Sequence, residues 1–148
     1  YIKDRYGIEN LYALDIINDT LPNEILNNHF DYILIPDVIE HIGNPVEFLS
    51  KIRNRFKNNV DTLVITTPNA FRLNNFINTF NKQEIINSDH RFWFSPFTLS
   101  KVVYDAGFKV DFFGFFEHSK LSKRQIFRKM LLSKRDALKD TLVIETKL

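Results

Sequence analysis

Short apolar runs alternate along this chain with longer stretches in which apolar residues recur every three or four positions. The short runs have the length of buried strands, and the longer stretches have the period of amphipathic helices. The strands predicted in this way span residues 11–17, 30–35, 62–67, 108–116 and 141–146. Because strands that alternate with helices form crossover units, the pattern predicts an α/β fold built on a mainly parallel sheet.

Two of the predicted helices have clear start signals. Asn44 is a typical N-cap residue, and Pro45 follows at the first helical position, where a missing N–H is tolerated. Ser95 and Pro96 repeat this arrangement, and Gly107 provides a stop signal after the second helix. We therefore expect helices to begin at these two prolines.

Two further segments depart from this alternation. The Asn-rich stretch after Asn69 has the spacing of a short amphipathic helix, and we expect the segment of about 70–94 to form a cap over the sheet. The segment 119–135 is basic and also has a helical period. With both segments included, residues 1–148 are expected to form a single domain.

Composition narrows the class of protein. Of the 148 residues, 44% are hydrophobic and 26% are charged, which is typical of a globular domain with one core. The absence of cysteine excludes a disulfide scaffold, a thiolate nucleophile and a cysteine-ligated metal site. No apolar run approaches the roughly 20 residues that cross a bilayer, and the first residues lack the apolar stretch of a secretory signal, so we expect a cytoplasmic protein.

Charge is distributed unevenly along the chain. The net charge is +2, but residues 119–148 carry nine Lys/Arg against three Asp/Glu, and the preceding part is acidic. An acidic body argues against a general nucleic-acid-binding protein. The basic segment 119–135 is either a solvated helix face or a contact for an anionic ligand or a peripheral membrane surface.

Polar residues follow three of the predicted strands. Ligands of open α/β sheets bind beyond the carboxyl ends of the strands, so these positions are candidates for a site. They are Asp15, Asn18, Asp19, Pro36, Asp37, Glu40, His41, Thr66, Thr67, Pro68 and Asn69. The same residue types are common in turns and caps, and a purely structural role is the alternative for each of them.

Four motifs follow one another in a distinctive order. They are Phe-Asp-Tyr-Ile-Leu at 30–34, Asp-Val-Ile-Glu-His-Ile at 37–42, Asn-Pro at 44–45 and Leu-Val-Ile-Thr-Thr-Pro-Asn at 63–69. Their order and spacing resemble the second half of class I S-adenosylmethionine-dependent methyltransferases of the small-molecule branch, over about 8–110. The resemblance implies an incomplete Rossmann-like methyltransferase sheet, mainly parallel with an antiparallel closing strand, and helices on both faces.

The resemblance also implies roles for individual residues. Asp15 corresponds to the acid beside the adenine of S-adenosylmethionine, and Ile16 would offer its backbone N–H to an adenine nitrogen. Pro36 and Asp37 correspond to positions beside the methionyl part of this cofactor, and His41 would lie toward the acceptor. The implied function is methyl transfer by the intact parent protein to a small-molecule or glycan-type acceptor.

Two histidines are candidates for proton transfer. Methyl transfer to a hydroxyl or ammonium group requires removal of a proton, and imidazole titrates near neutral pH. His41 is the first candidate base and His90 the second, the alternatives being a turn contact and a packing role. No metal site is expected, because no histidine pair has ligand spacing and Glu40 is adjacent to His41 in sequence.

One part of the family pattern has no counterpart in this sequence. The glycine-rich turn that approaches the cofactor would precede Asp15, but no G-x-G spacing occurs. We expect the chain to be the carboxyl-terminal portion of a longer methyltransferase, because strand 11–17 would have no neighbour in a sheet shortened in this way. The alternatives are a cofactor-free remnant that acts as a binding or scaffold partner, and a nucleic-acid contact module built on 119–135.

Overall fold

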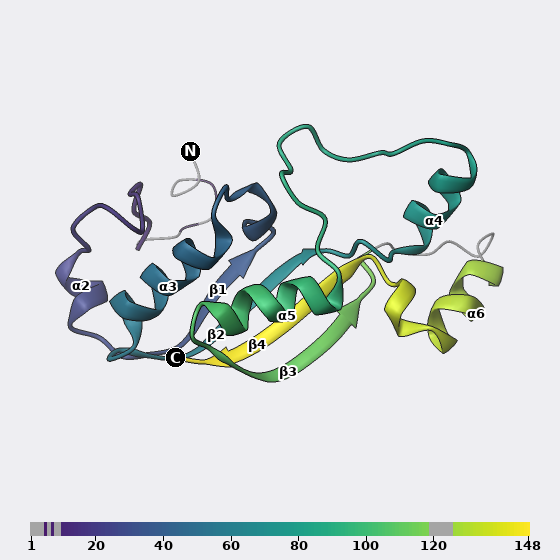
Figure 1. Ribbon diagram of the computed structural model, residues 1–148. Helices are drawn as coiled ribbons and strands as arrows, with labels where there is room; N and C mark the ends of the chain where they lie inside the picture. Colours follow the sequence, from purple (N-terminus) through teal and green to yellow (C-terminus); the bar gives the residue numbers. More distant parts are fainter. Residues whose placement is uncertain (1–4, 6, 8–9, 119–125) are drawn as a thin grey trace.

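The computed structural model describes residues 5, 7, 10–118 and 126–148 (Figure 1). The strands are β1 (Phe30–Pro36), β2 (Val60–Pro68), β3 (Lys109–Phe116) and β4 (Thr141–Lys147). The helices are α2 (Asn23–Leu26), α3 (Pro45–Phe56), α4 (Leu73–Phe80), α5 (Pro96–Asp105) and α6 (Ile126–Lys134). Two 3₁₀ turns, η1 (Ile39–His41) and η3 (Asp136–Leu138), complete the regular structure of this part of the chain.

The four strands form one open sheet in the order β1-β2-β4-β3. β1 pairs with β2 in parallel, while β4 is antiparallel to both of its neighbours. β1, β2 and β3 therefore run in one direction, and only the closing strand is reversed. This confirms the predicted α/β class, the mainly parallel sheet and the antiparallel closing strand. Because Pro36 pairs with Thr66, the carboxyl ends of β1 and β2 lie side by side.

One face of the sheet carries the core. A row of side chains crosses all four strands on this face, formed by Ile35, Ile65, Ile144 and Phe113. The three isoleucines are at most 6% exposed. Leu49 of α3 and Leu99 of α5 are fully buried in the same cluster, and the two helices contact each other. Both helices therefore cover the same face, as Figure 1 shows.

The opposite face is more open in the described part of the chain. The next row of the register consists of Leu34, Val64, Glu145 and Phe112. Leu34 is 68% and Phe112 54% exposed. α4 and α6 lie beyond one end of the sheet and do not cover this row (Figure 1). Helices were expected on both faces of the sheet. In the described part of the chain, α3 and α5 cover one face together, because both bury their apolar sides against the same row of side chains.

Residues 11–17 contain no strand, so this prediction is wrong. A strand needs a hydrogen-bonded neighbour, and β1 pairs only with β2 in the described part of the chain. The apolar residues of the segment are buried in another way, since Leu14, Ile16 and Ile17 pack against a cluster that contains Ile52 of α3. Arg55 fixes this position by donating a 2.6 Å hydrogen bond to the Ile17 carbonyl oxygen.

Both predicted helix starts are present. The Asn44 side chain accepts a hydrogen bond from the Glu47 N–H, and Ser95 forms a reciprocal capping box with Thr98. The expected cap segment, 70–94, contains α4, and the expected basic segment contains α6, whereas residues 119–125 lie outside the described residues. None of the described helices has the length and apolar character needed to span a membrane.

Candidate functional site

Asp37 directly follows β1 in an unusual backbone conformation. Its φ of 49° lies in the left-handed region, which Asp tolerates better than most residues. Two bonds to β2 hold it: the Asp37 N–H donates to the Thr66 carbonyl at 3.0 Å, and the Thr66 hydroxyl donates to Asp37 Oδ1 at 3.2 Å. Backbone strain of this kind concentrates at functional sites, which makes the end of β1 the first place to look for one.

Glu40 is a buried carboxylate in the turn that follows, with 1% of its surface exposed. Its Oε2 accepts a 2.9 Å hydrogen bond from the hydroxyl of Thr67, which is itself fully buried. Its Oε1 has no hydrogen-bond partner among the described residues and lies 3.9 Å from His90 Nε2. Burial of a half-satisfied carboxylate is costly, so this oxygen is available to a further partner.

His41 and His90, the two histidines predicted as catalytic, lie against each other. Their ring centroids are 4.7 Å apart and the rings are perpendicular. His41 Nδ1 lies 3.1 Å from the carbonyl oxygen of Asp89. Since a carbonyl oxygen only accepts, Nδ1 carries the proton and the lone pair is on Nε2. His90 Nδ1 is buried without a hydrogen-bond partner in the described part of the chain.

Main-chain bonds hold the His90 segment across the strand ends. The Arg91 N–H donates to the Glu40 carbonyl at 2.8 Å, and the Ala70 N–H donates to the Phe94 carbonyl at 2.8 Å. Phe94 also forms a parallel bridge with Asn69, just after β2. These bonds bring His90, which is 50 positions later in the chain, close to Glu40. Glu40 and Thr67 were both among the candidate residues after the strands, but the sequence did not indicate that Glu40 is buried or that Thr67 donates to it.

Asn69, another candidate of the sequence, has a structural role. It is fully buried, and its amide donates to the carbonyl oxygens of Ala137 and Lys139 at 2.8 and 2.7 Å. Its Oδ1 accepts a hydrogen bond from the Phe71 N–H. The amide thus ties the end of β2 to the turn before β4 and has little capacity left for a ligand.

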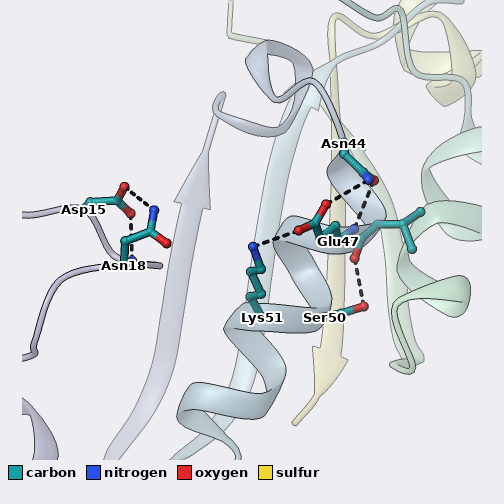
Figure 2. A network of polar contacts seen from close by, with 7 residues as sticks. Asp15, Asn18, Asn44, Glu47, Ser50 and Lys51 are labelled. Atoms are coloured by element: carbon teal, nitrogen blue, oxygen red, sulfur yellow. Dashed lines mark hydrogen bonds and ion pairs between the residues drawn. The ribbon is translucent and has the colours of Figure 1, made fainter.

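Asp15 lies in a local turn rather than at the end of a strand. Its carboxylate accepts a hydrogen bond from the Asn18 side chain at 2.8 Å (Figure 2). It also accepts one from the Ile17 N–H at 2.8 Å. These bonds, that from the Asn18 side chain above all, hold the pKa of Asp15 below its usual range. The N–H of Ile16 makes no hydrogen bond within the described part of the chain and remains available.

A cavity of about 360 Å³ connects Asp15 to the region just after His41. Its lining residues are Asp15, Ile16, Ile17, Asn18, Ile42, Asn44, Glu47, Phe48 and Lys51. Figure 2 shows Asp15 and Asn18 on one side and the polar network of the start of α3 on the other. In that network the Lys51 ammonium group holds the pKa of Glu47 below its usual range. Pro36 and Asp37 are outside this lining, so the structure does not bring all four predicted cofactor residues together in this cavity.

A larger cavity, of about 520 Å³, lies on the His90 side. It is lined by Ala70, Asn75, Asn78, Thr79, Lys82, Gln83, Glu84, Ile85 and Trp93. The ring of Trp93 lies 6.4 Å from that of His90, and its indole N–H donates to Glu84 at 2.8 Å. The Arg72 guanidinium lies over the indole at 4.9 Å, and its burial lowers its pKa. Trp93, whose ring contacts His90, thus lines this cavity, and Ile42, which follows His41, lines the smaller one.

Comparison with solved structures shows the fold of this chain in known methyltransferases. A SAM dependent methyltransferase from Archaeoglobus fulgidus is similar with a TM-score of 0.60 and 20% identity, over 99% of this chain and 71% of that chain. The small RNA methyltransferase HEN1 has a TM-score of 0.58 and 16% identity, over 86% of this chain and 14% of that chain. The methyltransferase domain of bacterial-CtHen1-CN has a TM-score of 0.52 and 18% identity, over 99% of this chain and 70% of that chain.

Sequence comparison gives the family. No curated protein matches this chain. Residues 6–111, however, match a family model described as a methyltransferase domain. This match spans all four predicted cofactor residues, His41 and His90. The chain therefore belongs to the methyltransferase-domain family, which confirms the methyltransferase resemblance drawn from the sequence.

Proposed function

We propose that the intact protein transfers the methyl group of S-adenosylmethionine to a small-molecule or carbohydrate-type acceptor. The observation that carries this proposal is the convergence at the end of β1: strained Asp37 is followed by His41, whose Nε2 lone pair is free, and His90 lies against it. These groups lie at the end of one strand, near two cavities. The carboxylate suits a cationic methyl donor, and the histidines suit a nucleophile that loses a proton.

The predicted cofactor residues would each contact a part of S-adenosylmethionine. Asp15 would accept a hydrogen bond from the adenine amine, since the three bonds that it accepts from Ile17 and Asn18 leave its Oδ2 a further lone pair. Ile16 would donate its unused N–H to an adenine nitrogen. Pro36 would offer its carbonyl to the methionyl ammonium group, and the carboxylate of Asp37 would favour the positive sulfonium.

The acceptor would approach from the cavity beside Trp93. Several side-chain amides, a carboxylate and an indole line this cavity, and together they can hydrogen-bond and stack on a polyhydroxylated ring. His41 Nε2 would take the proton of the acceptor hydroxyl as the oxygen attacks the methyl carbon, while the methyl–sulfur bond breaks and S-adenosylhomocysteine leaves. Because methyl transfer requires in-line approach, fixing the acceptor against the histidine pair would provide much of the rate.

Methyl-labelled S-adenosylmethionine tests this function. The protein expressed from its complete reading frame should bind the cofactor in calorimetry and transfer label to a member of a panel of sugars and phenolic small molecules. His41→Asn should lower kcat by about 100-fold. His29→Asn is the matched control, since exposed His29 pairs with Asp61 at the opposite end of β1, and it should leave kcat unchanged.

A second pair of variants tests the cofactor side. Asp37→Asn keeps a residue that tolerates the left-handed conformation but removes the charge, and it should weaken cofactor binding by about tenfold. Asp31→Asn, on the preceding strand β1, should leave cofactor binding unchanged. Binding without transfer to any small molecule, but with transfer to RNA, would overturn the acceptor class. No binding and no transfer would overturn the enzyme proposal in favour of a cofactor-free scaffold.

A further inference from the structure

We propose that Glu40, His41 and His90 form a binding site for a divalent transition-metal ion. One ligand atom from each of these three side chains lies within 4.8 Å of the other two. The cluster combines one carboxylate oxygen with two imidazole nitrogens, a ligand set found in protein sites for zinc and related ions. A main-chain hydrogen bond, from the Arg91 N–H to the Glu40 carbonyl, also joins the two segments that supply these side chains.

The state of Glu40 is the first argument for this site. Its Oε1 is buried and has no hydrogen-bond partner in the described part of the chain, although Oε2 of the same carboxylate is satisfied by Thr67. His90 Nε2, at 3.9 Å, is too distant for a hydrogen bond. A direct Glu40–His90 contact therefore does not account for the buried oxygen. A cation between these two atoms would satisfy the carboxylate that the fold has oriented.

The orientation of His41 is the second argument. A metal-binding histidine usually donates its other ring N–H to a carbonyl or carboxylate, which fixes the tautomer and the ring. His41 makes this bond, from Nδ1 to the Asp89 carbonyl, and its Nε2 lone pair is left for a ligand. His90 is 12% exposed and its Nδ1 has no partner in the described residues, so one of its nitrogens is likewise free to coordinate.

The spacing requires only a small adjustment. Ligand atoms around an ion with bonds near 2.1 Å lie about 3.0–3.5 Å apart, so the cluster must contract by roughly an ångström. His90 lies in the irregular segment before α5, which can make this shift, whereas Glu40 is fixed by β2. Two imidazoles favour ions such as Zn²⁺ and Co²⁺ over Mg²⁺, Ca²⁺ and Mn²⁺, which prefer oxygen ligands.

Three protein ligands leave open coordination positions, as in catalytic metal sites. Such an ion would supply Lewis-acid activation of an acceptor hydroxyl at the site of methyl transfer. His41 and His90 would then be ligands, and His41 would not serve as the free base. This catalytic role rests on the proposed function, but binding of the ion does not.

Titration with Co²⁺ in the absence of any methyl donor tests the site. The chelator-treated protein should bind one Co²⁺, seen in calorimetry and in visible absorption, and Zn²⁺ should displace it while Mg²⁺ should not. His41→Asn and His90→Asn should each weaken binding by about tenfold or more, and Thr67→Val, which loosens Glu40, by a smaller factor. His29→Asn is the matched control and should bind as the wild-type protein does.

Three outcomes would overturn the inference: no binding to the folded protein at millimolar Co²⁺, wild-type affinity for Co²⁺ in both histidine variants, or loss of binding in His29→Asn. Thermal unfolding by circular dichroism shows which variants are folded, and His90→Asn, in its irregular segment, serves as the test if His41→Asn unfolds. Methyl transfer that persists in chelator, without Co²⁺ binding, would remove the metal site and keep the proposed function. Co²⁺ binding without methyl transfer would keep the metal site and remove the proposed function.

Discussion

Thr67 donates a 2.9 Å hydrogen bond to Glu40, and both side chains are almost completely removed from solvent. The hydroxyl comes from the core-facing side of β2 and the carboxylate from the turn after β1. A neighbouring strand thus fixes the rotamer of the one buried acid beside the histidine pair. Because the bond uses only Oε2, it orients Oε1 toward His90 without satisfying it.

Replacement of Thr67 by Val tests how much this bond stabilises the fold. Valine keeps the shape of the side chain and suits a strand, but it leaves Glu40 Oε2 buried without a donor. We expect a loss of about 1–3 kcal/mol in the free energy of unfolding, measured by urea denaturation. Thr79→Val removes a comparable hydroxyl from the exposed side of α4 and should change stability by less than about 0.5 kcal/mol. Equal effects of the two substitutions would contradict the role given to Thr67.

The two faces of the sheet should respond differently to truncation. Leu63 is fully buried, and Leu63→Ala should cost about 2–5 kcal/mol because it leaves a cavity. Leu34 pairs with the residue that follows Leu63 and points to the open face, so Leu34→Ala should stay within about 0.5 kcal/mol. The same denaturation experiment compares them. A large loss for Leu34→Ala would mean that something covers this face in solution.

The start of α5 should depend on its capping residue. Ser95→Ala removes the acceptor for the Thr98 N–H and one half of the capping box, with an expected cost of about 1 kcal/mol. Ser100→Ala, inside the same helix, introduces a better helix former and should be neutral or slightly stabilising. The midpoints of thermal unfolding of the two variants should therefore move in different directions. A shared decrease would show that α5 is sensitive to any loss of a hydroxyl.

The Asp15 turn predicts a pH dependence with a defined sign. Hydrogen bonds from Asn18 and Ile17 stabilise the ionised form and lower the folded-state pKa of Asp15. The contribution of Asp15 to stability is therefore present above the pKa of an unfolded aspartate, and it is lost as the pH falls through the lower folded-state value. A carboxyl-carbon NMR titration should show the lowered pKa, and Asn18→Ala should raise it toward the usual range. An unchanged pKa in Asn18→Ala would assign the shift to the backbone bonds alone.

Local signals in the sequence predicted local structure well. Asn44-Pro45 and Ser95-Pro96 marked the starts of α3 and α5, because a cap depends on a few adjacent residues. Apolar runs predicted all four observed strands, because such a run also depends only on adjacent residues. The run 11–17 failed as a strand, since a strand is completed by a partner that the run itself does not specify.

The candidate site shows the same division. From the sequence alone, the motifs after the strands indicated the methyltransferase family and gave His41 as a candidate base. The contact of His41 and Glu40 with His90 had no such signal, because no ligand spacing links positions 50 residues apart. Hydrophobic period and capping determine which segments become strands and helices. Only the tertiary structure decided which distant side chains lie together at the candidate site. The register of β1 with β2, and the hydrogen bond from the Arg91 N–H to the Glu40 carbonyl, bring them together.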